Sequence, residues 1–346
     1  MRNVSRIPTA PGKKPKAFHP QATPPPQPQQ VLQGTVYKKS LGHYEVHVGD
    51  HVVACTLSSK LRKHLVYPVA DRTSVRPIVM EVRDIQAQDP IAIGDVVYVA
   101  PGGPGAGMIT DVMPRTRKLS RRAAGPKPLE QVIVANADQL VAVVAGAFPD
   151  PSWELLDRYL AAAEEAELPA LIVITKADLL EDSAVGGELE AYRRIGYRVL
   201  LTSATSGLGI EGCRAELRGR LSVFAGKSGV GKTTLLNTVQ PGLGLRVNEV
   251  SSITGKGKHT TTHLQMFPLE MGGSIMDTPG MREFGLWNVS GAEIATLFPE
   301  MRPLVGQCRF GLDCTHAHEP DCAIRDAVAA GSITQRRYHS YLRMAR

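Results

Sequence analysis

The chain has 346 residues, enough for two or three domains with a substantial core. Its formal net charge of +7 and its pI of about 9.2 favour an anionic partner without identifying it. No apolar run approaches the length that spans a membrane, and the amino terminus lacks the continuous apolar core of a secretory signal. We therefore expect a cytoplasmic protein without a membrane partner.

The positive charge is concentrated in three segments. Residues 1–30 combine five basic residues and eight prolines with no acidic residue, which predicts a disordered basic arm. The second segment is an apparent linker at 115–130, with Arg115, Arg117, Lys118, Arg121 and Arg122. The third, near the carboxyl end, places Arg336, Arg337, Arg343 and Arg346 beside Tyr338 and Tyr341. Each cluster alone is typical of a solvated face, whereas the three together favour an RNA partner.

Between the arm and the linker, residues 31–114 alternate short apolar runs with Gly- and Asp-rich turns. This pattern predicts a five-stranded barrel of the oligonucleotide-binding (OB) kind, although an SH3-like barrel would show a similar pattern. The stretch 60–90 is interpreted as a long insertion or loop. The expected strands are 34–37, 44–48, 52–55, 93–99 and 107–112.

From 131 to 290, predicted strands and helices alternate, as in an α/β domain. Leu140–Val144 predicts a strand, and Asp150 and Pro151 supply an N-cap and a first-turn proline for the helix that follows. The next apolar run, Leu171–Ile174, has the β-branched composition of a central parallel strand.

A T-K-A-D motif at 175–178 lies at the carboxyl end of that strand and matches the [NT]-K-x-D element with which GTPases read guanine. A carboxylate at Asp178 can accept hydrogen bonds from the guanine N1–H and 2-amino groups, which disfavours an ATP-using enzyme. A plain strand-end turn is the alternative. The T-S-A run at 202–204 resembles the further base-contacting loop of GTPases. The predicted guanine-site residues are Thr175, Lys176, Ala177, Asp178, Ser203 and Ala204.

Residues 226–233 form a complete G-x-x-x-x-G-K-[ST] phosphate-binding loop between an apolar run and a helix start. Its glycines let the backbone wrap phosphate oxygens, and the helix amino terminus directs N–H groups at them. Lys232 is expected to reach the β- and γ-phosphates and Thr233 to ligate Mg²⁺. The alternative is a Gly-rich turn that matches by accident. The predicted phosphate-site residues are Gly226, Lys227, Ser228, Gly229, Val230, Gly231, Lys232, Thr233 and Thr234.

A D-T-P-G run at 277–280 matches the D-x-x-G element, in which Asp277 organises Mg²⁺ and the Gly280 N–H senses the γ-phosphate. The Thr-rich segment 255–263 before it suits a switch that closes on Mg²⁺ and the γ-phosphate, or else a solvated hairpin. Many GTPases orient the attacking water with a Gln after D-x-x-G, but Met281 occupies that position here. His259 is the nearest candidate for that role, although a lone His is more often an incidental surface residue.

The order of these elements is unusual. The base-reading motif precedes the phosphate loop by about 50 residues, and the D-x-x-G element follows the loop. Ordinary GTPases carry the base reader after both. The sequence therefore predicts a circularly permuted GTPase.

Three of the five cysteines and one histidine form the pattern Cys-x5-Cys-x-His-x5-Cys. Three thiolates and one imidazole fill a closed tetrahedral site, which is typical of structural zinc and leaves no open position for catalysis. Buried or disulfide-bonded cysteines are the alternative, and the odd number of cysteines disfavours disulfides. His318 is a poorer substitute for His316, and Cys55 and Cys213 are expected to fill apolar space. The predicted zinc ligands are Cys308, Cys314, His316 and Cys322.

With these motifs in place, residues 31–346 resemble the circularly permuted small-ribosomal-subunit biogenesis GTPases of the RsgA (YjeQ) family. The resemblance also rests on P-R at 114–115, L-S-R at 119–121, A-N-A-D-Q at 135–139, H-T-T-T at 259–262, M-R-E-F-G-L-W at 281–287 and E-P-D-C-A at 319–323. It implies that a barrel and a zinc domain flank the GTPase and contact ribosomal RNA during late maturation of the small subunit.

By position, the resemblance also implies that His259 is the catalytic histidine and that Thr261 binds Mg²⁺. Two features depart from the family pattern. Thr175 replaces the commoner Asn, and the first zinc spacing is one residue longer than the usual x4.

We thus expect a monomeric GTP hydrolase whose nucleotide state controls docking on the rRNA of the small ribosomal subunit. Its three domains would be an OB-fold barrel at 31–114, a circularly permuted α/β P-loop GTPase domain at 131–290, and a mostly helical zinc-binding domain at 291–346. Mg²⁺ would accompany GTP, and one structural Zn²⁺ would bind per chain. The alternative is a zinc-containing RNA-binding module that uses GTP only as a structural ligand.

Overall fold

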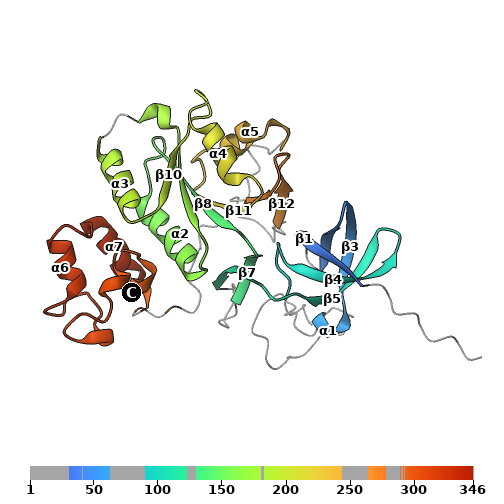
Figure 1. Ribbon diagram of the computed structural model, residues 1–346, viewed down its shortest axis with the longest axis horizontal. Coiled ribbons are helices and arrows are strands. Elements are labelled where there is room, and N and C mark those ends of the chain that lie inside the picture. The colour runs from blue at the N-terminus through green and yellow to red at the C-terminus, as the bar shows by residue number, and fades with distance from the viewer. Residues whose placement is uncertain are drawn as a thin grey trace, which may run out of the picture.

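The computed structural model shows three units side by side (Figure 1). A β-barrel lies at one end, an α/β unit in the middle and a small helical module at the other end. None of the described helices is long and apolar enough to cross a membrane. The predicted arm and most of the stretch 60–90 lie outside the described part of the chain. The described residues are 31–40, 42–62, 90–122, 130–180, 183–243, 264–277, 289, 291 and 293–345.

Five short strands close into the amino-terminal barrel, as predicted. They pair in the order β1-β2-β3-β5-β4, and β4 pairs back with β1. The β3–β5 pair is parallel, which distinguishes this OB-type barrel from an SH3-like meander. Inward-facing residues such as Val36, Val46 and Ile109 are fully buried. The elements are β1 Leu32–Ser40, β2 His43–Val48, β3 His51–Leu57, α1 Ser59–Arg62, β4 Val96–Gly103 and β5 Ala106–Val112.

The α/β unit contains six strands in the order β10-β9-β8-β11-β13-β12, parallel except for the β12–β13 pair. In β8, Leu140 and Ala142 pack in the core that contains α2, whereas Val141 and Val143 pack in the core with α4 and α5. Both faces are therefore covered, which explains the continuous apolar run. The strands are β8 Gln139–Ala145, β9 Ala170–Thr175, β10 Arg198–Leu201, β11 Leu221–Ala225, β12 Leu264–Pro268 and β13 Ser274–Asp277.

The helices of this unit connect the parallel strands. The first begins two residues later than the sequence pattern predicts, because Ser152 and not Asp150 is its N-cap. One face of this helix is buried, including Leu156, Tyr159 and Leu160. The helices are α2 Trp153–Glu165, α3 Ser183–Arg194, α4 Ile210–Leu217 and α5 Lys232–Val239, with the 3₁₀ turns η1 Ala177–Leu179 and η2 Pro241–Leu243.

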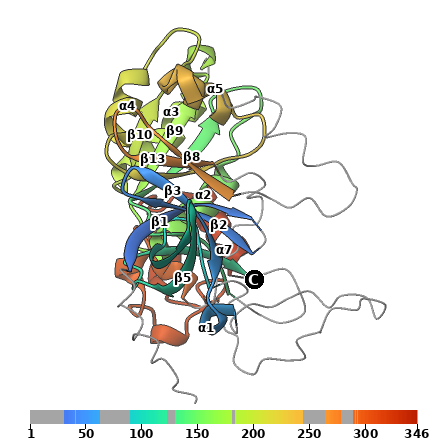
Figure 2. The ribbon, with the colours of Figure 1, turned by 90° about the vertical axis from the view of Figure 1, so that its right-hand side faces the viewer.

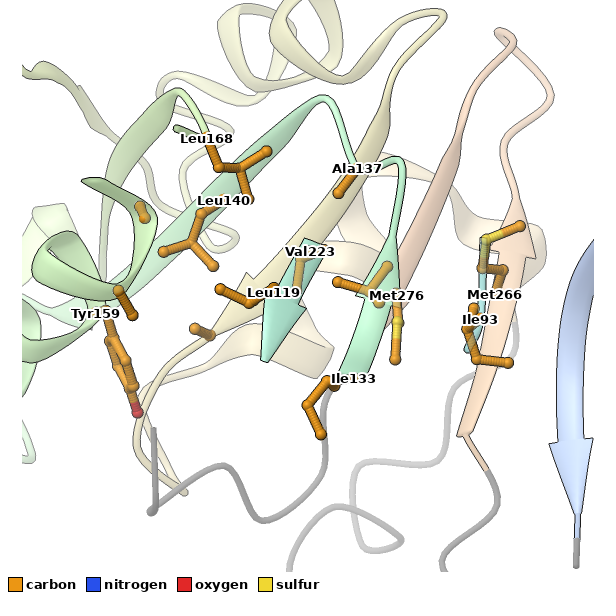
Figure 3. Packing of buried hydrophobic residues seen from close by; sticks show 14 of the residues in the cluster. Ile93, Leu119, Ile133, Ala137, Leu140, Tyr159, Leu168, Val223, Met266 and Met276 are labelled. Carbon is orange, nitrogen blue, oxygen red and sulfur yellow. The ribbon is translucent and has the colours of Figure 1, made fainter. Parts of the chain in front are cut away.

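One core extends from the α/β unit towards the barrel. Figure 3 shows Leu140 and Tyr159 in the same buried cluster as Val223, Leu119 and Ile133. The last two come from an antiparallel pair, β6 and β7, so part of the predicted linker is a strand that packs against the sheet. The pair comprises β6 Lys118–Arg122 and β7 Glu130–Ala135.

The barrel and the α/β unit are also joined by backbone pairing. Strand β1 runs antiparallel to β12, with Lys38 opposite Gln265, so the barrel continues the central sheet (Figure 2). A second junction forms at Gly94, where a Cβ would lie 2.1 Å from the carbonyl oxygen of Ala135. Only glycine permits this approach, which holds the barrel close to β7.

The carboxyl-terminal module is built from short helices around its own core. The sequence predicts a mostly helical domain here, and its described part contains two α-helices separated by a turn. Helix α7 packs against α2 of the α/β unit. The elements are η5 Ile294–Leu297, η6 Arg302–Leu304, η7 Gly311–Asp313, α6 Ala323–Ala329 and α7 Gln335–Met344.

Candidate nucleotide and metal sites

The phosphate loop connects β11 to α5 and depends on its glycines. Gly229 and Gly231 have φ angles of 82° and 92°, which other residues rarely adopt. A Cβ at Gly226 would lie 2.6 Å from the carbonyl oxygen of Val143. Lys232, the first residue of α5, donates from Nζ to the carbonyl of Gly226 at 2.8 Å. The loop and the helix amino terminus together form an anion-binding concavity.

The first residue of the base-reading motif is bonded to the phosphate loop. Thr175 ends β9 and is only 5 % exposed. Its hydroxyl donates to the main-chain carbonyl of Val230. Thr in place of the commoner Asn thus keeps a side-chain donor that joins the base reader to the phosphate loop.

The second residue of the motif, Lys176, connects two loops. It adopts a φ of 54°, and its ammonium donates to the carbonyl of Phe148 and, at 3.3 Å, to that of Gly229. Phe148 lies in the loop after β8, and Gly229 lies in the phosphate loop. One ammonium therefore holds the base reader, the β8–α2 loop and the phosphate loop together.

Asp178 lies in η1 with an exposed side chain. Within the described residues no hydrogen bond or ion pair engages its carboxylate, which leaves it available to a ligand. The Ala177 N–H donates to the Thr202 carbonyl at 3.0 Å, so η1 lies beside the loop that carries Ser203. The Ser203 hydroxyl accepts a bond from the Ser206 N–H at 3.1 Å, which fixes that loop.

The D-x-x-G element begins beside the phosphate loop. Strand β13 ends at Asp277, whose register partner in β11 is Phe224, two residues before the phosphate loop starts. The other predicted switch residues, His259, Thr261 and Gly280, lie outside the described residues. Their roles stay predictions.

The four predicted zinc ligands lie together in the helical module. Their ligand atoms are all within 4.8 Å of one another, and all four residues are buried. The Nδ1 atom of His316 lies 3.3 Å from Sγ of Cys308 and 3.4 Å from Sγ of Cys322. The longer first spacing therefore does not separate Cys308 from the other three. Burial raises the pKa of Cys314 to about 12 and lowers that of His316, so a bound cation would be needed to stabilise the thiolate.

Hydrogen bonds fix the backbone around this cluster. The Glu319 carboxylate accepts from the Thr315 hydroxyl and from the N–H groups of Thr315 and His318. The bond from the Thr315 hydroxyl is the largest cause of the lowered pKa of Glu319, about 2. The Tyr338 hydroxyl donates to the carbonyl of His316 at 2.6 Å. These partners hold the candidate ligands in place.

Two arginines of the carboxyl-terminal basic cluster dock the helical module instead of facing solvent. Arg337 pairs with Asp157 of α2 at 2.7 Å and with Glu300 at 2.7 Å, and it is 3 % exposed. Arg336 pairs with Asp157 at 2.6 Å, and its guanidinium lies over the Tyr192 ring. This corrects the interpretation that favours RNA for these two residues.

Three members of the linker cluster are likewise engaged within the protein. Arg115 forms two 2.7 Å bonds with the fully buried carboxylate of Asp95. Lys118 pairs with Glu130 at 2.7 Å, and Arg121 donates to a neighbouring side chain. A cleft of about 1300 Å³ beside this linker is lined by both basic and acidic residues. The described part of the linker thus does not form an uninterrupted basic surface.

The A-N-A-D-Q run at 135–139 also forms contacts that hold parts of the fold together. The Asn136 carboxamide accepts from the Thr116 N–H at 2.9 Å and donates to the Gly94 carbonyl at 3.0 Å. Asp138 accepts from the Leu221 N–H at 2.7 Å, which positions the start of β11. These residues join the barrel, the linker and the phosphate-loop strand, a role that the motif alone does not reveal.

Comparison with known proteins agrees with this geometry. The family model for the RsgA GTPase matches residues 112–287. A Gemmatimonas aurantiaca protein named small ribosomal subunit biogenesis GTPase RsgA is 45 % identical over 256 residues, which cover 73 % of this chain and 83 % of the relative. A Moorella thermoacetica protein of the same name is 40 % identical over 312 residues, or 90 % of this chain and 95 % of the relative.

Two solved structures share the fold. YjeQ from Thermotoga maritima has a TM-score of 0.68 and 29 % identity, covering 91 % of this chain and 97 % of its own. YloQ, described as a circularly permuted GTPase, has a TM-score of 0.63 and 26 % identity, covering 95 % and 96 %. The fold and the site thus define a circularly permuted P-loop GTPase. The chain belongs to the RsgA GTPase family.

Proposed function

We propose that this GTPase binds the small ribosomal subunit and assists its late maturation. The assignment of the nucleotide site rests on one observation: the base-reading motif and the D-x-x-G element both lie against the phosphate loop, although they occur in permuted order in the chain. The Thr175 and Lys176 side chains bond to the phosphate loop, and β13 delivers Asp277 beside it. The small ribosomal subunit is proposed as the partner because it appears in the names of the relatives.

At the nucleotide, Lys232 and the loop N–H groups hold the phosphates, and Asp178 reads guanine. The donor set for Mg²⁺ is the Thr233 hydroxyl, at the start of α5, with Asp277 at the end of β13 and the Thr261 hydroxyl. Oxygen donors of this kind suit Mg²⁺, which neutralises charge on the transferred phosphoryl group. The Gly280 N–H senses the γ-phosphate, and His259 orients the attacking water.

The cluster of Cys308, Cys314, His316 and Cys322 holds one structural Zn²⁺. Its donor set of three sulfurs and one nitrogen, buried at mutual distances below 4.8 Å, fits this ion. All four positions belong to the protein, so the ion stabilises the helical module and takes no part in hydrolysis.

The bound nucleotide controls docking on the small subunit because the D-x-x-G element directly precedes the helical module in the chain. The segment after Asp277 leads into the helical module, and α7 of that module is anchored on α2 beside the nucleotide sheet. A change at the γ-phosphate can therefore reach the module along the chain that follows Asp277. We expect a cytoplasmic monomer whose barrel and helical module contact the small subunit and its rRNA.

The decisive experiment measures GTP hydrolysis with isolated small and large subunits, and co-sedimentation with GDP or a non-hydrolysable GTP analogue. We expect tighter binding of the GTP form to small subunits, weakening with salt as phosphate contacts release counterions. By linkage, the subunit must then favour the GTP state. Equal affinity for small subunits with GDP and with the GTP analogue, or a higher affinity for large subunits, would refute the proposal. Absence of turnover in every condition would support a structural role for GTP.

A further inference from the structure

The turn between the first two cysteines of the metal cluster exposes two large apolar side chains. Leu312 is 75 % exposed and Phe310 is 47 % exposed. Other large side chains of the same module, such as Phe298 and Ile324, are fully buried in its core. Exposed apolar area on a folded module is a feature by which interaction surfaces are recognised.

The turn is held by contacts within the module. Cys308 and Cys314 anchor it from both sides in the buried cluster. The Gly311 N–H donates to the carbonyl of Cys308 at 2.8 Å, and the Arg309 N–H donates to the carbonyl of Asp321 at 3.1 Å. A turn held in this way loses little conformational entropy when a partner binds.

The charges around the turn are acidic in balance. Asp313 and Asp321 are exposed, and Glu319 carries a third carboxylate. Against them stand Arg309, which pairs with Asp321 at 3.2 Å, and Arg325. RNA phosphates would be repelled by the excess carboxylate, whereas a basic protein surface would complement it.

The apolar pair also fits a protein better than a nucleobase. The Arg309 guanidinium lies 6.0 Å from the Phe310 ring centroid, an arrangement that could stack a base. However, the more exposed member of the pair is Leu312, which has no aromatic face. An exposed aliphatic and an exposed aromatic side chain two positions apart in one turn suit an apolar pocket.

We propose that Phe310 and Leu312 dock on a protein of the small ribosomal subunit, in an apolar pocket with a basic rim. This inference rests on the proposed function and adds to it a class of partner. The helical module would contact protein at this turn, while rRNA contacts lie elsewhere on the molecule.

The first test uses the full-length, zinc-loaded protein and purified small subunits. The double variant Phe310→Ser, Leu312→Ser should bind small subunits about ten-fold more weakly, because two apolar side chains no longer leave water. Its zinc content and subunit-free GTP hydrolysis should equal those of the wild type. The matched variant Phe310→Leu, Leu312→Met, which keeps apolar character, should bind like the wild type. Unchanged binding of the Ser variant would overturn the inference.

The second test separates protein from RNA. A photo-crosslinking amino acid in place of Leu312 should crosslink to a protein of the purified subunit. Crosslinking to rRNA, or an equal loss of affinity of the Ser variant for protein-free small-subunit rRNA, would overturn the inference. Failure of the wild-type chain to bind small subunits would instead refute the proposed function, and this inference with it.

Discussion

The hydroxyl of Thr175 donates to the main-chain carbonyl of Val230, so one buried hydrogen bond joins the base-reading strand to the phosphate loop. The bond connects two segments that lie 55 residues apart in the chain. Because a shift of one segment relative to the other would break this bond, we expect base recognition and phosphate binding to depend on each other.

Removal of this bond should weaken nucleotide binding without changing base preference. Thr175→Val keeps the shape but leaves the Val230 carbonyl unpaired, so GTP and GDP affinity should fall together by about ten-fold, or ~1.4 kcal/mol. Thr175→Ser keeps the hydroxyl and should stay near wild type. Titration calorimetry with both nucleotides measures the effect. Equal affinities for the Val and Ser variants would show that the bond is irrelevant.

Base specificity should depend on Asp178, whose carboxylate is exposed in η1. Asp178→Asn replaces an acceptor by an amide that also donates, so xanthine nucleotides should replace guanine nucleotides as the preferred ligands. Competition binding with GTP, XTP and ATP tests this. Displacement of GTP by ATP as effectively as by GDP in the wild-type chain would contradict the guanine assignment.

Catalysis should be separable from binding at His259. His259→Ala should lower the turnover number by about 100-fold with GTP affinity near wild type, since water positioning matters in the transition state. His263→Ala, four residues away in the same Thr-rich segment, is the matched control and should stay active. Single-turnover hydrolysis and nucleotide titration provide the two readouts. Similar turnover numbers for both variants would show that His259 has no specific role in hydrolysis.

Metal content should follow the clustered cysteines only. Cys314→Ala should lose the single zinc and loosen the helical module, because structural zinc contributes folding energy directly. Cys213→Ala, at a buried cysteine of α4 far outside the cluster, should keep one zinc per chain. Elemental analysis and limited proteolysis of residues 300–345 provide the measurement. Full zinc retention in Cys314→Ala would disprove the site.

Two arginines of α7 should differ sharply in their effect on stability. Arg337 pairs with buried Asp157, whereas Arg343 pairs with Glu154 at the surface. Arg337→Ala removes one of the two arginines that pair with Asp157 and also the guanidinium that pairs with the largely buried Glu300. The loss of these buried charge pairs should cost about 3–5 kcal/mol of unfolding free energy. Arg343→Ala removes an exposed pair and should leave stability close to wild type. Denaturant unfolding of both variants makes the comparison, and equal costs would argue against a buried docking contact.

The Arg337 contact also shows what the sequence could not predict. The phosphate loop can be predicted from the sequence because its glycines and the start of its helix are neighbours in the chain. The zinc cluster can be predicted from the spacing of its ligands. Asp157 and Arg337 are 180 residues apart, and nothing in either neighbourhood distinguishes a buried pair from two solvated charges. Basic clusters are therefore the weakest part of the sequence interpretation, since their partners are set by tertiary packing.

The same limit applies to the turn between Cys308 and Cys314 and to Asn136. Sequence spacing brings Cys308 near Cys314, but exposure of Leu312 between them depends on how the module packs. Asn136 belongs to a recognisable run, yet its bonds to Thr116 and Gly94 appear only when the linker folds back on β7.

The pairing of β1 with β12 has a consequence for solubility. Strand β12 is the last strand of the α/β sheet, and an uncovered edge strand offers its backbone groups to other chains. Strand β1 covers part of this edge, opposite Leu264 and Gln265. A fragment that starts after residue 130 would carry β12 without this cover and be exposed to edge-to-edge aggregation. We therefore expect the barrel to limit self-association at this edge, independently of any RNA or nucleotide.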